Sequence, residues 1–267
     1  MTALLKKRDR GEGASELVSE LQSVTVSFGE KVVLKNFSLQ IPKGRRISVL
    51  GESSSGKSTL LKVLTGLVPP EAGKVLLFNR DVSALKLTDL ERSRRRLGMQ
   101  FQAGALFDSM NVAENLFLAS LESSRRRGGR EAASKEEIAA MLKNVGLEKA
   151  AALSPSSLSG GMKKRAAIAR ALIVNPELAI FDEPTAGLDP LTSGSIIRLL
   201  NRLSENLGAA MILATSDVDV ARRFSADIVI LHEGGIRARG SLEEHLTNPD
   251  PYIVKFLARY RKLGSAD

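Results

Sequence analysis

The clearest chemistry lies in a glycine-rich loop that ends in Lys-Ser, with the residues Gly51, Glu52, Ser53, Ser54, Ser55, Gly56, Lys57 and Ser58. Such a loop offers backbone N–H groups to a triphosphate, a lysine cation to its outer phosphates and a hydroxyl to Mg²⁺. The segment therefore predicts binding of a nucleoside triphosphate. The alternative is a Gly/Ser surface turn before an ordinary helix.

Two adjacent carboxylates, Asp182 and Glu183, follow an apolar run at residues 178–181 that is typical of a core strand. The carboxyl ends of such strands are where α/β sheets bind ligands. Beside a phosphate loop, the first carboxylate suits the coordination of Mg²⁺, and the second suits orienting or deprotonating an attacking water. A solvated strand end is the alternative.

Two adjacent glycines, Gly160 and Gly161, follow Leu158 and Ser159 and precede a helical pattern. Backbone N–H groups at such a turn form a second anion-binding nest. A loop with a helix cap explains the same residues. A phosphate site without a lysine of its own makes sense if it completes the pocket of another copy of the chain.

The elements that position these residues follow from the pattern of apolar side chains. Residues 47–50 are typical of a short buried strand and residues 57–64 of the helix after the loop, so that loop and helix N-terminus face the same anion. We also expect antiparallel strands at 21–28 and 32–41, a strand at 75–78, parallel strands at 178–181 and 210–214 around a helix at 193–207, and a closing hairpin at 228–231 and 236–239.

A helical insert is expected between the strands, from residue 85 to about residue 174. Its clearest helices are at 111–116 and 136–142, and residues 121–135 are typical of an exposed, mobile connection. Residues 1–20 are polar and charged, as in a loosely attached arm.

Composition limits the class of protein. A chain of 267 residues, 43% of them hydrophobic, is long enough for one large α/β domain with a subdomain. Because there is no cysteine, disulfides and thiolate metal sites are excluded. We expect a cytosolic protein, free or peripherally bound, because no stretch approaches the roughly 20 apolar residues that span a bilayer and the start lacks a signal-peptide apolar region.

The net charge of +9 raises the possibility of nucleic acid or an anionic membrane as a partner. The basic runs lie at residues 6–8, 92–96, 125–130 and 163–165, and no aromatic residues for base stacking are interleaved with them. Solvated helix faces and contacts with a membrane-proximal partner explain these runs at least as well. We therefore expect no nucleic acid as the main ligand.

In their order along the chain, these motifs resemble those of an ATP-binding cassette (ABC) transporter ATPase domain. The matching residues after the loop are Gln102, Leu158-Ser159-Gly160-Gly161, Asp182-Glu183, Ala186-Gly187-Leu188-Asp189 and Thr215-Ser216-Asp217. The resemblance covers about residues 21–240. It implies an α/β P-loop NTPase (RecA/F1-like) core with an antiparallel β subdomain, from 21–100 and 174–240, and a helical ABC signature subdomain at 101–173.

The resemblance also implies a role for each matched residue, with ATP and Mg²⁺ as ligands. Lys57 would hold the outer phosphates, Glu183 would be the catalytic base, and Asp189 would link two active sites. Ser58, Gln102 and Asp182 would bind Mg²⁺ directly or through water. Other contacts with ATP would come from the remaining loop residues, from Thr59 and from Phe28, whose ring would stack on adenine. Ser159, Gly160 and Gly161 of a second copy, bound head to tail, would also contact ATP. For Phe28, a place in the core is the alternative.

Two residues depart from the pattern of the family. Ser54 occupies a loop position that is usually glycine, which implies slight strain in the loop. Ser216 stands where the family has a catalytic histidine that contacts the γ-phosphate. Because a serine hydroxyl is shorter and neutral, we expect hydrolysis to be slower than in a histidine-bearing relative.

One segment, residues 99–112, resembles the ATPase subunit of Mla-type phospholipid transporters, which work with MCE (mammalian cell entry) proteins. Met162 and residues 248–257 resemble that subfamily as well. This implies a homodimer on the cytoplasmic face of a bacterial inner-membrane permease, with residues 103–115 receiving the permease. An MCE-domain protein and a small cytoplasmic regulatory subunit would be further partners, and phospholipid would move between the inner and outer membranes.

The last segment, residues 241–267, is expected to be a docking tail. Ile253, Phe256, Leu257 and Tyr260 would share one helix face. Packing of that face against the chain's own core is the alternative.

Besides the ATPase of another ABC transporter, two rival functions remain open at this point. One is a regulatory ABC subunit that binds ATP with little hydrolysis, which Ser216 favours and Glu183 opposes. The other is a DNA-repair or translation ATPase of the same superfamily, but such relatives generally carry a long coiled coil or two cassettes, and this chain has neither.

Overall fold

The computed structural model describes residues 16–102, 104–124 and 131–263, with side chains to residue 260. The strands are β1 (Leu17–Phe28), β2 (Lys31–Pro42), β3 (Arg46–Leu50), β4 (Ala72–Leu77), β5 (Arg80–Asp81), β6 (Leu97–Gln100), β7 (Leu178–Asp182), β8 (Ala210–Thr215), β9 (Ile228–His232) and β10 (Gly235–Gly240). The α-helices are α1 (Lys57–Leu64), α2 (Leu87–Arg94), α3 (Val112–Ser124), α4 (Lys135–Asn144), α5 (Gly160–Leu172), α6 (Pro190–Leu207), α7 (Val218–Phe224), α8 (Leu242–Thr247), α9 (Pro251–Phe256) and α10 (Ala258–Leu263).

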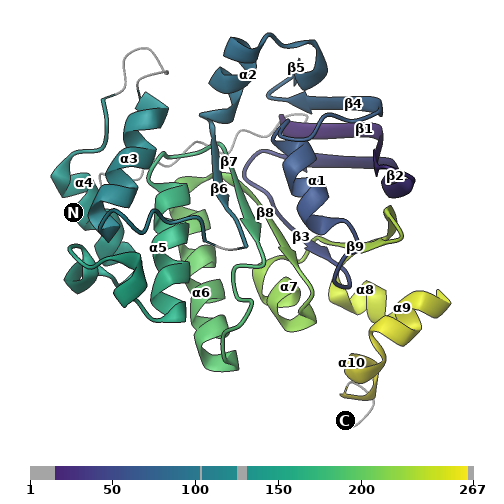
Figure 1. Ribbon diagram of the computed structural model, residues 1–267. Helices are drawn as coiled ribbons and strands as arrows, with labels where there is room; N and C mark the ends of the chain where they lie inside the picture. Colours follow the sequence, from purple (N-terminus) through teal and green to yellow (C-terminus); the bar gives the residue numbers. More distant parts are fainter. Residues whose placement is uncertain (1–15, 103, 125–130, 264–267) are drawn as a thin grey trace.

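Two sheets form the frame of the molecule (Figure 1). The larger has six strands in the order β10-β9-β3-β8-β7-β6, parallel except for β10. The smaller has four antiparallel strands in the order β2-β1-β4-β5. Helices α3, α4 and α5 gather on the side of the molecule opposite β1, β2 and β4 (Figure 1). The expected α/β core with an antiparallel β subdomain and a helical subdomain is therefore confirmed.

The alternation of side chains along the central strands builds two separate cores. In β7, Ala179 and Phe181 pack with the helices α3, α5 and α6, whereas Leu178 and Ile180 pack with α1 and the smaller sheet. All four side chains are fully buried. A strand covered on both faces explains why this part of the sequence is an unbroken apolar run.

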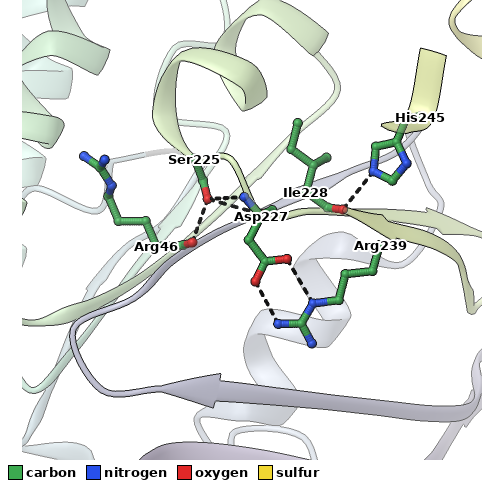
Figure 2. A network of polar contacts seen from close by, with 6 residues as sticks. All are labelled: Arg46, Ser225, Asp227, Ile228, Arg239 and His245. Carbon is green, nitrogen blue, oxygen red and sulfur yellow. Dashed lines mark hydrogen bonds and ion pairs between the residues drawn. The ribbon is translucent and has the colours of Figure 1, made fainter. Parts of the chain in front are cut away.

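Polar contacts fix β9 beside β3, which precedes the glycine-rich loop. The Ser225 hydroxyl donates to the carbonyl of Arg46 over 2.6 Å and accepts from the N–H of Asp227 over 3.0 Å (Figure 2). The buried ring of His245 donates through Nε2 to the carbonyl of Ile228 over 2.9 Å (Figure 2). These bonds join the strand to the end of α7 and to α8.

The C-terminal helices pack against the chain's own core. Ile253 and Leu257 are fully buried, and Phe256 and Tyr260 are partly buried, in a cluster with β3 and β9 residues. The expected docking helix is divided at Leu257 into α9 and α10. Its apolar face is occupied within the chain, as the alternative interpretation of this segment stated.

Several expected bounds were wrong. β4 and α6 each begin three residues earlier than expected, at Ala72 and Pro190. β1 begins at Leu17 rather than at residue 21, because Val18 is already a buried strand residue. Residues 97–100, within the stretch expected to be helical, form β6 on the edge of the larger sheet. Residues 121–124 continue α3 instead of beginning a connection. The rest of the predicted arm, residues 1–15, and residues 125–130 lie outside the described residues.

Candidate functional site

The glycine-rich loop connects β3 to α1 in a conformation that two of its glycines make possible. A Cβ atom on Gly51 would lie 2.5 Å from the carbonyl oxygen of Leu231, which is closer than any side chain tolerates. Gly56 adopts φ 106°, and a Cβ atom there would lie 2.9 Å from the carbonyl oxygen of Val33. The N–H of Gly51 donates to the carbonyl of Thr215 over 3.3 Å, which ties the loop to the end of β8.

Lys57 spans this loop from its place in the first turn of α1. Its ammonium donates to the carbonyls of Gly51 and Glu52, each over 2.9 Å, and lies 3.7 Å from Glu183 Oε1. Burial lowers the pKa of Lys57 below its ordinary value, although the carboxylates of Glu183 and Asp182 oppose this effect. The lysine is therefore a buried cation directed at the predicted catalytic carboxylates.

The serines of the loop differ in environment. Ser54 is exposed and adopts φ 65°, a left-handed conformation that costs a residue with a side chain about 1–2 kcal/mol. This bears out the strain expected from serine at a glycine position. The hydroxyl of Ser55 is buried without a hydrogen-bond partner among the described residues, while Ser58 and Thr59 are half-buried at the start of α1.

The two carboxylates stand at the end of β7. Asp182 is only 5% exposed, and its Oδ1 atom has no hydrogen-bond partner in the part of the chain that the structure describes. Glu183 adopts a left-handed backbone conformation with φ 46°, and its N–H donates to the carbonyl of Ala214 over 2.9 Å. Left-handed residues with side chains are costly and concentrate at functional sites.

The residues at this end of β7 fit a single hydrated Mg²⁺. A buried carboxylate oxygen without a partner, as in Asp182, is the kind of hard oxygen ligand that Mg²⁺ prefers. Among the described residues, no cluster of three His, Cys, Asp or Glu side chains could form an all-protein cage. The ion would therefore rely on Asp182, on the hydroxyl of Ser58, on Gln102, on water and on phosphate oxygens.

Gln102 is exposed at the beginning of a loop that α5 and α3 hold in place. The ammonium of Lys164 donates to its carbonyl over 3.0 Å. Farther along, Arg170 donates to the carbonyl of Ala105 over 2.7 Å, and its guanidinium lies 5.2 Å from the ring centre of Phe107. Most of the segment expected to receive a permease is thus attached to the helical subdomain.

The signature residues lie at the N-terminus of α5. Ser159 is the N-cap, and its exposed hydroxyl accepts from the N–H of Met162 over 3.3 Å. Gly160 is exposed, and a Cβ atom on Gly161 would lie 2.9 Å from Thr192 Cγ2. No hydrogen bond or ion pair joins residues 159–161 to residues 51–58 in the described part of this chain.

Asp189 has a local role as the N-cap of α6. Its Oδ1 atom accepts from the N–H groups of Thr192 and Leu191, each over 3.0 Å. Hydrogen bonding by Thr192 and Leu191 lowers the pKa of this exposed carboxyl group. The adjacent Leu191 is 84% exposed, an unusual environment for an apolar side chain.

Phe28 and Ser216 are both exposed, and each belongs to a segment that contacts the loop. Phe28 is 55% exposed at the end of β1, which excludes the alternative that it is a core residue. It belongs to the β1–β2 hairpin, and that hairpin reaches the loop through Val33 and Gly56. Ser216 is exposed directly after Thr215, whose carbonyl binds the loop.

Sequence reasoning missed two residues of this site, Lys164 and Gln100. Gln100 is 1% exposed, and its Nε2 atom donates to the carbonyl of Phe101 over 2.5 Å and to that of Asp182 over 3.4 Å. Lys164 donates to the carbonyls of Gln102 and Glu183. A glutamine in a buried strand is a signal that could have been noticed, whereas Lys164 was hidden within a basic run.

The described basic runs serve mainly internal contacts. Arg94 donates to the carbonyls of Thr65 and Gly66 over 3.0 and 2.6 Å. Arg96 forms a two-bond ion pair with Glu177 over 2.7 and 2.8 Å. These arginines are not available as a continuous basic surface for nucleic acid. The runs at residues 6–8 and 125–130 lie outside the described residues.

Known proteins are similar to this chain in sequence and in fold. The ABC transporter family profile matches residues 34–186. The chain is 37% identical over 238 residues to the intermembrane phospholipid transport system ATP-binding protein MlaF of Haemophilus influenzae, with 89% of each chain covered. It is 34% identical over 239 residues to the methionine import ATP-binding protein MetN of Desulfitobacterium hafniense, with 89% of this chain and 69% of the relative covered. A solved dimeric structure, the ATP-binding cassette MJ0796 in a post-hydrolysis state bound to ADP and Pi, has a TM-score of 0.74 and 35% identity, covering 84% of this chain and 98% of that one.

Proposed function

This chain belongs to the ABC transporter family, and from that premise we propose that it is the ATP-hydrolysing subunit of a bacterial transporter that moves phospholipid between the inner and outer membranes. The main observation in favour of hydrolysis is that the ammonium of Lys57 lies 3.7 Å from Glu183 Oε1, next to Asp182, whose Oδ1 atom has no hydrogen-bond partner among the described residues. A phosphate-binding cation, a base and a metal ligand then stand in one small region, as phosphoryl transfer to water requires.

Each residue has a distinct task in this proposal. The loop N–H groups and Lys57 bind the outer phosphates, and Phe28 stacks on the adenine ring. Glu183 accepts the proton of the attacking water, because its carboxylate faces the cation that holds the phosphates. When bound through Ser58, Asp182 and Gln102, Mg²⁺ would neutralise negative charge on the phosphates.

We further propose that the working unit is a head-to-tail homodimer. Ser159 and Gly160 are exposed at the start of α5, so they are free to meet the γ-phosphate of ATP on a second copy. The dimeric cassette structure at 35% identity supports this arrangement. Asp189 and the exposed Leu191 would lie near the contact between the two copies.

The proposed membrane partner is an inner-membrane permease that binds the surface around residues 104–115, from the cytoplasmic side. Phe107 is 45% exposed in that segment and Phe117 is 44% exposed on the neighbouring α3. In the part of the chain that the structure describes, none of the helices has the apolar length that a membrane span requires. An MCE-domain protein and a small cytoplasmic regulatory subunit complete the proposed assembly.

Phospholipid is favoured as cargo by the relative from Haemophilus influenzae, which is an intermembrane phospholipid transport ATP-binding protein at 37% identity. The methionine import relative, at 34% identity, makes another ABC transporter the second candidate. A third candidate is a regulatory subunit that binds ATP with little hydrolysis. Ser216 favours it, because a neutral hydroxyl there replaces a γ-phosphate donor, and the Lys57–Glu183 geometry opposes it.

Turnover of the purified full-length protein, compared with Glu183→Gln, tests hydrolysis. We expect the variant to bind ATP as the wild type does and to lose at least about 100-fold in kcat, because the general base is removed. Equal, negligible turnover in both proteins would instead support the regulatory subunit.

Purification of the native complex tests the cargo. We expect a multispanning permease and an MCE-domain protein to co-purify, with phospholipid identified by mass spectrometry. A complex with an amino-acid permease, or with nucleic acid, would contradict the proposed cargo while leaving the hydrolysis assay unaffected.

A further inference from the structure

Two side chains connect the Gln102 loop with the end of β7 through backbone carbonyls. Lys164 donates to the carbonyl of Gln102 over 3.0 Å and to that of Glu183 over 3.3 Å. Gln100 donates to the carbonyls of the preceding residue in each segment, Phe101 and Asp182. Two consecutive residues of the loop are thus joined to two consecutive residues of the carboxylate segment.

Gln100 and Lys164 make these connections from different elements. Gln100 is buried in β6, so its bonds lie within the central sheet. Lys164 comes from α5, the helix that begins at Ser159. It is therefore the described side chain that ties the signature helix to both segments at once.

The backbone of Glu183 needs such support. It holds a left-handed conformation at φ 46°, which a residue with a side chain keeps only when its surroundings fix it from several directions. Its N–H is fixed by the carbonyl of Ala214 on β8. Its carbonyl is fixed by Lys164.

The chemistry of Lys164 suits this task better than that of a neutral donor. Burial lowers the pKa of the half-buried Lys164, whereas the carboxylates of Glu183 and Asp182 oppose this effect and favour its charged form. Charge-assisted hydrogen bonds are roughly twice as strong as neutral ones. Lys57 approaches the same carboxylates from α1, so the pair of acids lies between two lysines on different elements.

We propose that Lys164 is a positioning residue for ATP hydrolysis, which holds the backbone of Gln102 and Glu183 in register with the signature helix. It acts through the backbone of these two residues. Movement of α5 when a second copy binds would then be transmitted directly to the base and to the metal-binding loop. The role in turnover rests on the proposed function, whereas the connection itself is a property of the nucleotide-free chain.

The test compares Lys164→Met, Lys164→Arg and the control Lys143→Met in the full-length protein. Lys143 is exposed in the last turn of α4, so its variant removes the same charge from the helical subdomain without touching the site. Hydrogen–deuterium exchange without nucleotide is measured for peptides covering residues 98–110 and 180–189. Turnover and binding of a fluorescent ATP analogue are measured in parallel.

In Lys164→Met we expect roughly tenfold faster exchange in both peptides and a roughly tenfold lower kcat, because two charge-assisted bonds are lost. Analogue affinity should change less than about twofold, since the loop that binds phosphate is intact. Lys164→Arg should restore both exchange and kcat, because arginine retains the donor and the charge. Lys143→Met should behave as the wild type.

Unchanged exchange in Lys164→Met would overturn the proposal. So would a loss of analogue binding equal to the loss of kcat with a lower unfolding midpoint, because Lys164 would then support only the fold. If the wild type lacks turnover, hydrolysis as the proposed function fails, and the exchange measurement still decides whether Lys164 holds the two segments together.

Discussion

The ammonium of Lys57 lies 3.7 Å from a carboxylate oxygen of Glu183 and donates to two carbonyls of its own loop. The predicted phosphate-binding cation and the predicted base therefore neutralise one another before any nucleotide arrives. A triphosphate competes for the lysine, because phosphate oxygens are stronger acceptors than carbonyls. We infer that ATP binding both occupies Lys57 and releases Glu183 to face water.

The buried state of Lys57 predicts a pH-dependent stability. Its pKa is lowered in the folded chain, so between that lowered value and the ordinary value of 10.5 the unfolded chain binds more protons. Stability then rises with pH in this window. The free energy of unfolding of the wild type relative to Lys57→Met should increase from pH 8 to pH 10 in urea titrations.

Lys62→Met provides the matched control, because Lys62 is exposed on the same helix. Its difference from the wild type should stay constant over this pH range. A relative stability of the wild type that falls with pH would mean that Glu183 outweighs burial at Lys57 and that the predicted sign is wrong.

A second prediction concerns the strained Ser54. Glycine adopts φ 65° without penalty, so Ser54→Gly removes the strain, but glycine also gives the unfolded chain more conformational entropy. The net effect should be to stabilise the nucleotide-free chain by about 0.5–1 kcal/mol. Chemical denaturation measures the change. Ser53→Gly is the control, since the exposed Ser53 is absent from the left-handed residues and should lose rather than gain stability. Equal losses in both variants would contradict strain at Ser54.

The sequence predicted those parts of the site in which local chemistry determines local shape. The helix expected at 57–64 matches α1 in both bounds, because a glycine at φ 106° ends the loop and the helix can only begin after it. The strands before the loop and before Asp182 were found for a different reason. They are covered on both faces, so the expected runs at 47–50 and 178–181 are apolar apart from the buried Ser48.

The parts that were missed depend on contacts between distant segments. β6 has four residues and follows an arginine run, so it carries too little alternation to be told from a helix, and pairing with β7 alone makes it a strand. Lys164 resembles its neighbour Lys163 in sequence. Only the packing of α5 against β6 and β7 turns one of these lysines toward Glu183.

The proposed permease surface can be tested at Phe107, whose ring is 45% exposed while Asn115 holds its backbone N–H and carbonyl over 2.8 and 3.1 Å. Phe107→Ala should leave turnover of the isolated subunit within about twofold and abolish its stimulation by the permease in reconstituted vesicles. Leu106 is partly buried against the helical core, so Leu106→Ala would also cost about 1–2 kcal/mol in stability and is less specific.

Leu87→Ala is the control for this experiment, because Leu87 is 68% exposed on α2, outside the segment 104–115. It should change neither turnover nor stimulation. Undiminished stimulation in Phe107→Ala would show that the permease binds elsewhere.

The last prediction concerns Ser216, which is exposed after Thr215 at the end of β8, next to the carbonyl that binds Gly51. A histidine at this position would add a donor toward the γ-phosphate, and a preorganised donor to developing charge is worth tenfold or more in rate. Ser216→His should therefore raise kcat by roughly tenfold. Ser216→Ala, which offers no donor, should not raise it.

The substitutions at position 216 should leave the local fold intact, because the neighbouring Asp217 caps α7 through the N–H groups of the next turn. If histidine and alanine give the same kcat in a steady-state phosphate-release assay, the slow-hydrolysis hypothesis for Ser216 is wrong.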